Sequence, residues 1–276
     1  MTTLDGKVAL ITGAARGQGR SHAVRLASEG ADIIAIDICA DIATMDYPNA
    51  NSADLQETVR LVEDLGRKIV AIEADVRDAA QTTKAVDDGV ATFGRLDIVL
   101  SNAGIVRLGD GPDDEAQLWE DVVATNLTGG WNVTRAAIPH IQAGGSGGSI
   151  IFTGSTAGVR PTPTTSTGAF AYTASKWGLV GLCKQLAAGL AKDSIRVNIV
   201  HPTGVASGMT MNEAMAKMFE QAATSDSNAL ATMQNAMPVE ILQPEDISDA
   251  ISFLVSDRAK WITGVSLPVD AGFSIR

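Results

Sequence analysis

The sequence is poor in cysteine, in aromatic residues and in positive charge, and each shortage excludes a class of protein. Two cysteines among 276 residues, Cys39 and Cys183, cannot form a disulfide framework, and neither belongs to a metal-binding motif. Aromatic residues make up 4% of the chain, so the core must be built from Ala, Val, Ile and Leu. Lysines and arginines number 21 against 32 aspartates and glutamates, which argues against binding to nucleic acid or to an anionic membrane.

Long apolar runs and a leader sequence are also missing. No apolar run is long enough to span a bilayer, and the first residues lack the basic region and cleavage site of a signal peptide. No cluster of His, Cys, Asp and Glu has the spacing of metal ligands. We therefore expect a cytoplasmic protein without a metal. Glycine, in contrast, is abundant with 27 residues, which indicates tight turns and close backbone approaches.

Short β-branched runs alternate with longer segments of helical periodicity. This alternation is typical of right-handed βαβ units, whose parallel sheet is covered on both faces. The sequence therefore predicts an α/β, doubly wound Rossmann fold with about seven strands, formed by one domain over residues 1–276. The predicted strands are residues 8–11, 32–37, 69–73, 96–100, 148–153, 195–200 and 264–269. The predicted helices are residues 17–28, 55–65, 81–93, 116–141, 172–191 and 244–255.

Two stretches interrupt this rhythm. Residues 39–53 form a polar insert after the second strand, and residues 205–239 form a methionine-rich segment after the sixth. Open α/β sheets bind ligands at the carboxyl ends of their strands, and both stretches would overhang that edge. Because methionine adapts to irregular apolar shapes, we interpret residues 205–239 as a substrate loop suited to a hydrophobic alcohol or ketone.

A glycine-rich loop joins the first predicted strand to the first helix. Gly13, Gly17 and Gly19 would let backbone N–H groups approach a pyrophosphate, and the helix adds its positive end. The glycine spacing is wider than that of G-x-G-x-x-G. The position between a strand and a helix nevertheless indicates a dinucleotide site.

The end of the second strand indicates which dinucleotide is bound. Asp37 could accept both hydroxyls of the adenosine ribose and would repel a 2′-phosphate. Arg16 could instead pair with a 2′-phosphate, but Ile38 supplies no second positive charge. We therefore predict NAD(H) as the cofactor.

Tyr172 and Lys176 are one turn apart on a predicted helix and share a face. A lysine ammonium favours the phenolate form of a neighbouring tyrosine, which can then take a proton from an alcohol. Ser155 follows the fifth strand, where its hydroxyl could bind the substrate oxygen. A tyrosine–lysine pair alone is also typical of a helix surface, so the prediction depends on the three residues together.

Two points about these residues stay open. The interval from Ser155 to Tyr172 holds an apparent inserted loop at residues 161–168, and Thr153, Thr156 and Ser166 are the alternatives to Ser155. Asn126, followed by two glycines, interrupts a long helix. Such a conflict with helix propensity marks either a local kink or a functional site.

Taken together, these motifs resemble those of the short-chain dehydrogenase/reductase family along the whole chain. The resemblance rests on Gly13-x-x-x-Gly17-x-Gly19, Ser101-Asn102-Ala103-Gly104, Tyr172-x-x-x-Lys176 and His201-Pro202-Thr203-Gly204. It implies catalysis by Tyr172 as general base or acid with Ser155 and Lys176, and it implies that Asn126 holds a water that links Lys176 to solvent. The implied cofactor-binding residues are Gly13, Arg16, Gly17, Gln18, Gly19, Asp37, Ile38, Asp75, Val76, Asn102, Ala103, Gly104, Tyr172, Lys176, Pro202, Val205 and Ser207.

Within that family the chain is similar to the mycofactocin-associated, carveol-dehydrogenase-like branch, on residues 37–48, 55–63 and 201–205. This resemblance implies a cyclic or terpenoid-like secondary alcohol as substrate. It also implies a tightly held NAD that mycofactocin, a separate redox carrier, reoxidises. The resemblance to the wider family implies a homotetramer. The alternatives are a dehydrogenase with freely exchanging NAD and a non-catalytic nucleotide-sensing protein of the same fold. The intact set of Asn126, Ser155, Tyr172 and Lys176 argues against the last.

Overall fold

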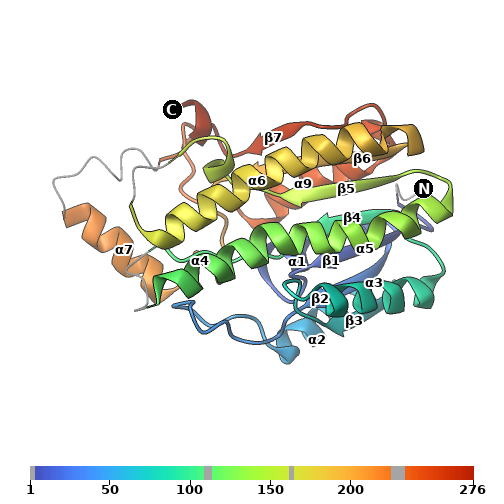
Figure 1. Cartoon of the computed structure of the whole chain (residues 1–276), viewed down its shortest axis with the longest axis horizontal. Coiled ribbons are helices and arrows are strands. Elements are labelled where there is room, and N and C mark those ends of the chain that lie inside the picture. Colours follow the sequence, from blue (N-terminus) through green and yellow to red (C-terminus); the bar gives the residue numbers. More distant parts are fainter. Residues whose placement is uncertain (1–3, 109–113, 162–164, 225–233) are drawn as a thin grey trace.

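The computed structural model describes residues 4–108, 114–161, 165–224 and 234–276 (Figure 1). Seven parallel strands form one sheet in the order β3-β2-β1-β4-β5-β6-β7. The strands are β1 (Val8–Thr12), β2 (Asp32–Asp37), β3 (Ile69–Glu73), β4 (Ile98–Ser101), β5 (Gly148–Thr153), β6 (Ile195–Pro202) and β7 (Ser266–Val269). The predicted doubly wound α/β fold is thereby confirmed, and the strand order reverses between β1 and β4.

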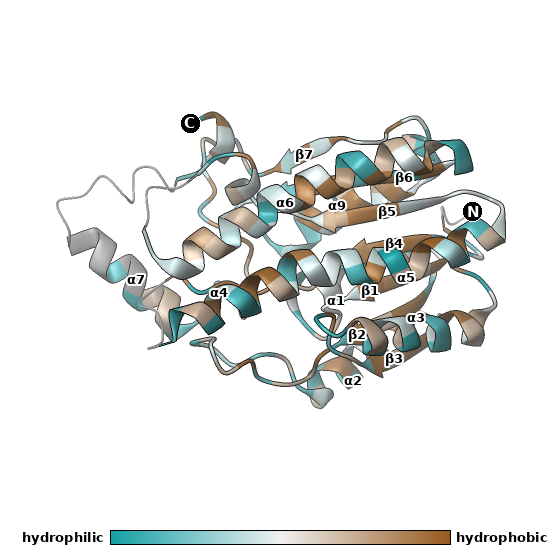
Figure 2. Cartoon of the chain, viewed as in Figure 1, coloured by the Kyte–Doolittle hydropathy of each residue, from teal (hydrophilic) through white to brown (hydrophobic). Residues whose placement is uncertain are grey.

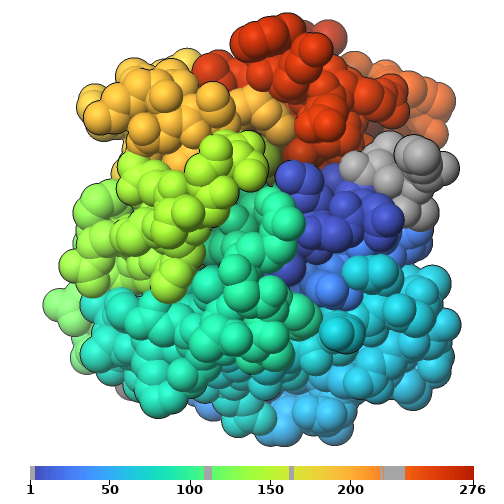
Figure 3. Space-filling model, turned by 90° about the vertical axis from the view of Figure 1, so that its right-hand side faces the viewer, coloured from blue at the N-terminus to red at the C-terminus, as the bar shows by residue number. Residues whose placement is uncertain are grey.

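Helices cover both faces of the sheet. One face packs against α1 (Gly17–Ser28), α2 (Ser52–Glu63) and α9 (Pro244–Val255). The other packs against α3 (Ala79–Phe93), α5 (Gly129–Gly144) and α6 (Thr167–Leu190), and α4 (Glu115–Val123) lies in line with α5. Figure 3 views the opposite end of the sheet from the candidate site, with α3 low in the picture and the C-terminal segments at the top.

The strands are apolar on both sides because both sides are covered. In β1, Val8 and Leu10 belong to the core beneath α3, α5 and α6, whereas Ala9 and Ile11 belong to the core beneath α1 and α9. Every residue of β1 is buried, and the strands are correspondingly hydrophobic in Figure 2. This explains why they form continuous apolar runs in the sequence rather than alternating ones.

The helix predicted at residues 116–141 contains a π-helical segment, Ala124–Thr128, between α4 and α5. Asn126 lies inside that segment. The glycines that follow it allow close packing, because a Cβ at Gly129 would stand 2.6 Å from Cγ2 of Val76 and one at Gly130 would stand 3.0 Å from Cδ2 of Leu179. The conflict seen in the sequence is therefore a real backbone irregularity, of the kind often found at functional sites.

Helix α6 begins earlier than predicted. It starts at Thr167, because the side chain of Ser166 caps it by accepting a hydrogen bond from the amide of Ala169 at 3.3 Å. The loop predicted at residues 161–168 is therefore shorter at its carboxyl end, and residues 162–164 lie outside the described part. Tyr172 stands in the second turn of α6 rather than at the helix start.

The insert and the substrate loop both lie at the carboxyl ends of the strands, as predicted (Figure 1). The substrate loop contains α7 (Glu213–Thr224), which the sequence analysis did not predict, and residues 225–233 lie outside the described part. No helix within the described ranges is long and apolar enough to cross a membrane.

Candidate active site

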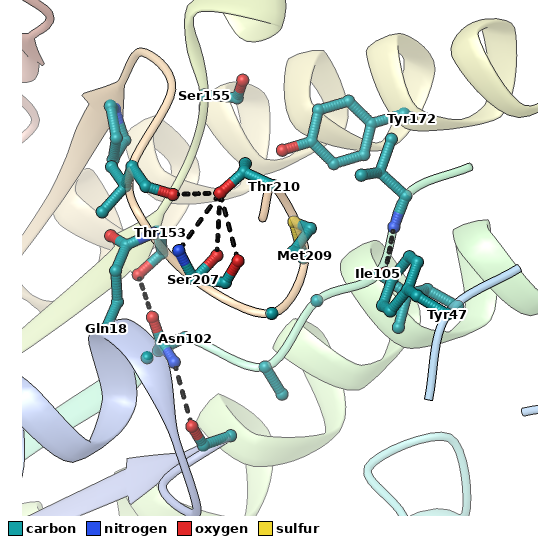
Figure 4. Close-up of a pocket in the computed structure, with 18 of the residues that line it drawn as sticks. Gln18, Tyr47, Asn102, Ile105, Thr153, Ser155, Tyr172, Ser207, Met209 and Thr210 are labelled. Carbon is teal, nitrogen blue, oxygen red and sulfur yellow. Dashed lines mark hydrogen bonds between the residues drawn. The ribbon is translucent and has the colours of Figure 1, made fainter. Parts of the chain in front are cut away.

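A cavity of about 1070 Å³ lies at the carboxyl edge of the sheet. The glycine loop, the insert, the ends of β4 and β5, α6 and the substrate loop all contribute to its wall (Figure 4). Every residue predicted to bind the cofactor or to take part in catalysis lines this cavity, except Asn126. The structure thus brings together residues that are up to about 190 positions apart in the chain, as a sheet edge allows.

The glycine loop is shaped for a close backbone approach. Gly13 and Gly17 have positive φ values of 67° and 54°, which favour glycine. A Cβ at Gly19 would stand 1.9 Å from the carbonyl oxygen of Gly13, so no other residue fits there. Helix α1 has no side-chain cap at its N-terminus, which leaves its first N–H groups available to an anion. The loop therefore fits the pyrophosphate of a dinucleotide.

Asp37 lies at the end of β2 and lines the cavity with 8% of its surface exposed. Its carboxylate accepts hydrogen bonds from the backbone amides of Ala15, at 3.0 Å, and Cys39, at 3.2 Å. These bonds fix the carboxylate next to the glycine loop, where a negative charge suits ribose hydroxyls and opposes a phosphate. This geometry supports NAD over NADP.

Arg16 does not form an anion site in this arrangement. Its Nη2 donates to the carbonyl oxygen of Pro48 at 2.7 Å, so it ties the glycine loop to the insert. Its guanidinium also packs against the substrate loop, where a Cβ at Gly208 would stand 2.8 Å from Cζ of Arg16. Arg16 therefore lines the cavity between two loops that are distant in sequence.

Asn102 joins the carboxyl ends of three neighbouring strands. Its Nδ2 donates to the carbonyl oxygen of Thr12 at 3.0 Å. Its Oδ1 accepts from the hydroxyl of Thr153 at 3.1 Å (Figure 4). The hydroxyl of Thr12 in turn accepts from the amides of Asn102 and Ala103, both at 3.1 Å. Asn102 thus holds β1, β4 and β5 together at the point where the strand order reverses.

The other predicted cofactor residues also line the cavity. Two of them, Asp75 and Ser207, form bonds with other residues of the protein. The carboxylate of Asp75 pairs with the guanidinium of Arg77 at 2.8 Å, so it is already engaged by the protein. Ser207 contacts Thr210, whose hydroxyl also bonds the carbonyl of Val205 (Figure 4). The remaining residues of this group are Gln18, Ile38, Val76, Ala103, Gly104 and Pro202.

Tyr172 and Lys176 face the cavity from consecutive turns of α6. The Nζ of Lys176 donates to the carbonyl oxygen of Thr153 at 2.8 Å and lies 5.3 Å from the centre of the Tyr172 ring. The phenol of Tyr172 points into the cavity on the side where Ser155 and Thr210 lie (Figure 4). Among the alternatives to Ser155, Thr153 hydrogen-bonds Asn102 and Ser166 caps α6, so each has a structural role.

The pKa values of this pair differ from the expectation. Burial raises the pKa of Tyr172 above its usual value, and hydrogen bonding with Ser155 opposes that rise. Burial lowers the pKa of Lys176 to about 8. The sequence predicts that Lys176 favours the phenolate and so lowers the pKa of Tyr172. In the protein without ligand this pKa is raised instead, because desolvation penalises the phenolate more than its neighbours stabilise it.

Asn126 lies behind the cavity wall and organises it. Its Oδ1 accepts from the amide of Ile105 at 2.8 Å, and its Nδ2 donates to the carbonyl oxygen of Ile105 at 2.9 Å and to Oγ of Ser175 at 3.2 Å. Ser175 donates to the carbonyl oxygen of Tyr172 at 2.7 Å. Asn126 therefore connects the loop after β4 to the turn of α6 that carries Tyr172.

Tyr47 is a cavity residue that the sequence analysis did not single out. It belongs to the insert, and its hydroxyl accepts a hydrogen bond from the amide of Val106 at 3.2 Å. Burial raises its pKa to about 12. Tyr47 and Ile105 lie together across the cavity from Ser207 in Figure 4. The only available signal was an aromatic residue before Pro48 in an otherwise polar insert.

Comparisons with known proteins agree with this geometry. A family model described as short chain dehydrogenase matches residues 7–217. The (−)-trans-carveol dehydrogenase of Rhodococcus erythropolis is 44% identical over 284 residues, covering 100% of both chains. The crystal structure of carveol dehydrogenase from Mycobacterium avium in complex with NAD has a TM-score of 0.91 and 44% identity, and covers 100% of both chains. That of a short chain dehydrogenase from Mycobacterium paratuberculosis bound to NAD has a TM-score of 0.93 and 44% identity, and covers 99% of this chain and 100% of the other.

Proposed function

This chain belongs to the short-chain dehydrogenase family, as its motifs predicted. From that premise we propose that it oxidises a hydrophobic secondary alcohol to a ketone, with Tyr172 as the base. It is an NAD-dependent alcohol dehydrogenase. One observation carries the proposal most directly. The phenol of Tyr172, with Lys176 beneath it, shares a single cavity with the glycine loop that fits a dinucleotide.

Bound NAD would supply the hydride acceptor for the carbinol carbon. The glycine loop would hold its pyrophosphate, Asp37 its adenosine ribose and Lys176 its nicotinamide ribose. Tyr172 takes the hydroxyl proton of the alcohol as the carbon loses hydride, and in the reverse direction it returns that proton to the ketone oxygen. Lys176 stabilises the phenolate form by its positive charge.

Ser155 orients the reacting oxygen. Its Oγ accepts a hydrogen bond from the amide of Ala157 at 3.1 Å, which leaves its own proton free to be donated. That proton can bond the substrate oxygen or the Tyr172 phenolate, both of which carry developing negative charge. Asn126 supports this arrangement through Ser175 and the backbone of Tyr172.

The substrate end of the cavity favours an apolar molecule. Ile105, Val106, Met209, Met215 and Phe273 line it, and the ring of Tyr47 lies beside Ile105. A cyclic or terpenoid-like secondary alcohol suits such a wall better than a charged hydroxy acid, because burial of a charge without a partner is costly. The test is a panel of cyclohexanol, carveol and lactate with NAD. We expect kcat/KM to rise with apolar surface and lactate to be inert.

We further propose that NAD stays bound between turnovers and is reoxidised by a separate carrier, mycofactocin. Contacts of the insert support this. Arg16 bonds Pro48, and the hydroxyl of Thr44 donates to Oδ2 of Asp121 on α4 at 2.8 Å. Thr44→Val should speed the exchange of labelled NAD, whereas Thr92→Val, on the exposed side of α3, should not. Equal exchange rates in both variants and in the wild type would show that the insert does not retain NAD.

A homotetramer in the cytoplasm remains our expectation for the assembly and location. The exposed rings of Trp131 on α5 and of Phe170 and Trp177 on α6 support self-association, because large apolar side chains on two neighbouring helices favour an interface. Light scattering on the purified protein tests the oligomeric state.

A further inference from the structure

His201, near the end of β6, binds the backbone of Ser155 without lining the cavity. Its Nδ1 lies 2.8 Å from the carbonyl oxygen of Ser155 and 3.4 Å from the amide nitrogen of the same residue. A carbonyl oxygen can only accept, so the shorter contact requires that Nδ1 carries the proton and donates it. Assigning the proton to Nδ1 leaves Nε2 with a lone pair.

Gly154 makes this contact possible. A Cβ at Gly154 would stand 2.6 Å from Nδ1 of His201 and 2.8 Å from the carbonyl oxygen of Val200. The amide of Gly154 donates to that same carbonyl at 2.7 Å, which continues the pairing of β5 with β6. The residue before Ser155 must therefore lack a side chain for the imidazole to reach it.

His201 uses only one of its two ring nitrogens. The side chain is fully buried, and its Nε2 has no hydrogen-bond partner within the described residues. A buried polar atom without a partner costs stability that an apolar side chain of similar shape would not. An apolar side chain would therefore fill this space at a lower cost in stability than a histidine does. Within the described residues, the hydrogen bond from Nδ1 to Ser155 is the favourable polar contact of the imidazole.

Ser155 is held by three hydrogen bonds. Its carbonyl oxygen accepts from Nδ1 of His201 and from the amide of Gly158, both at 2.8 Å, and its side-chain oxygen accepts from the amide of Ala157 at 3.1 Å. Its backbone is extended, with φ of −171° and ψ of 160°. The bond from Gly158 comes from within the same short turn, whereas the bond from His201 ties the carbonyl of Ser155 to β6. Loss of the His201 bond would therefore let the whole turn, with the Ser155 hydroxyl, move relative to Tyr172.

We propose that His201 is a positioning residue: its Nδ1–H holds the carbonyl of Ser155 and thereby keeps the Ser155 hydroxyl directed at the Tyr172 phenol. The inference rests on the proposed roles of Ser155 and Tyr172. The pKa of His201 is lowered, mainly by burial and also by the positive charge of Lys176. The contact with Ser155 and the negative charge of Asp270 oppose this fall without cancelling it. The ring is therefore neutral at pH 7 and acts as a fixed donor rather than as a proton shuttle.

Two substitutions separate a donor from a space-filling side chain. His201→Asn places an amide N–H about where Nδ1 stands, and His201→Gln places it about where Nε2 stands. The matched control is His22→Gln. His22 is also fully buried with an unpartnered Nε2, and its Nδ1 contacts Oγ of Ser248 at 2.8 Å between α1 and α9, away from the cavity.

The readout is the pKa of Tyr172, which needs no substrate. The chain holds two tyrosines, Tyr47 and Tyr172, so tyrosine labelled at Cζ gives two NMR signals, and Tyr47→Phe assigns them. Because Ser155 lowers the pKa of Tyr172, Ser155→Ala should raise it. His201→Gln should raise it in the same direction, whereas His201→Asn and His22→Gln should leave it unchanged.

A double-mutant comparison and kinetics complete the test. His201→Gln should add nothing in a Ser155→Ala background, and it should lower kcat for carveol by about tenfold or more without changing the KM for NAD. If that variant does not fold, Gly154→Ala, which displaces the imidazole, should give the same rise in pKa.

Three results for the pKa of Tyr172 would each overturn the proposal. The pKa could be unchanged in His201→Gln, it could rise equally in His201→Gln and His201→Asn, or the rises from His201→Gln and Ser155→Ala could add fully in the double mutant. If the NMR pattern holds while carveol and the other alcohols are inert, His201 still positions Ser155 and only the proposed substrate fails.

Discussion

The Nζ of Lys176 lies 5.3 Å from the centre of the Tyr172 ring, one turn further along α6, and donates to the end of β5 through the carbonyl oxygen of Thr153. The tyrosine that carries the proton is thereby fixed to the sheet edge that carries Ser155. Lys176 is only 3% exposed and Tyr172 is partly buried, so the ammonium acts on the phenol in a medium that weakens screening by water.

Tyr172→Phe should abolish turnover and spare the cofactor. Phenylalanine keeps the ring and its packing but has no proton to exchange, so we expect kcat to fall by about 10³-fold or more. NAD binding, measured by calorimetry or by quenching of tryptophan fluorescence, should change little. Turnover close to that of the wild type would show that another group moves the proton.

The pH dependence of the two directions should be opposite. Oxidation needs the phenolate of Tyr172, whose pKa is raised by burial, so kcat/KM for the alcohol should rise with pH up to about 8, where Lys176 begins to lose the charge that stabilises the phenolate. Reduction needs the phenol, so kcat/KM for the ketone should fall as pH approaches the pKa of Tyr172. Rate profiles with one alcohol–ketone pair check this, and parallel profiles would contradict it.

Gly104→Ala should disturb catalysis by crowding. A Cβ there would stand 3.2 Å from Oδ1 of Asn126, so that side chain must shift by a few tenths of an ångström, and it would come into van der Waals contact with Nζ of Lys176 at 3.5 Å. We expect kcat to fall by about tenfold, because catalysis is sensitive to small displacements. The control is Gly189→Ala on α6, where a Cβ meets nothing within 4 Å and should add about 0.5–1 kcal/mol of stability without loss of activity.

Asp37→Asn should weaken the preference for NAD. The amide keeps the shape of the side chain but removes the charge that opposes a 2′-phosphate. We expect KM for NAD to rise and the ratio of kcat/KM for NAD over NADP to fall by about tenfold or more. Asp41→Asn, on the exposed part of the insert, is the matched control. An unchanged ratio would show that Asp37 acts only through its bonds to Ala15 and Cys39.

Acid should destabilise the fold through His22. Its folded pKa is about 3 against an ordinary 6.5, because burial disfavours the charged ring. The unfolded chain therefore binds the extra proton between these values, and the free energy of unfolding falls as pH falls through that window, by about 1.4 kcal/mol per pH unit for one proton. Chemical denaturation at several pH values should show that the free energy of unfolding falls less steeply with acid in His22→Gln than in the wild type. Some fall should remain in that variant, because the pKa of His201 is also lowered in the folded protein.

The sheet and the cofactor loop were predictable because local patterns determine them. Continuous apolar runs such as β1 require cover on both faces, and glycines with positive φ mark the turn between β1 and α1. The irregularity at Asn126 was visible as a conflict with helix propensity. Its form, a π-helical segment that binds the Ile105 backbone, depends on contacts with a distant loop.

Long-range contacts explain what the sequence did not reveal. The bond between Tyr47 and the amide of Val106 joins residues 59 positions apart, so no local pattern encodes it. The raised pKa of Tyr172 follows from desolvation by the tertiary packing around it, which a helix periodicity cannot predict. The early start of α6 was misjudged because residues 161–168 were interpreted as an inserted loop, whereas Ser166 acts as a helix cap.

The most direct test of the central claim is the absorbance of reduced nicotinamide after carveol or another cyclic terpene alcohol is added to the purified protein, first without and then with free NAD. We predict that the wild type forms reduced nicotinamide, as a single burst if the NAD is retained or as steady turnover once NAD is added, and that Tyr172→Phe forms none. No reduced nicotinamide from the wild type under either condition, or equal amounts from both proteins, would contradict the account.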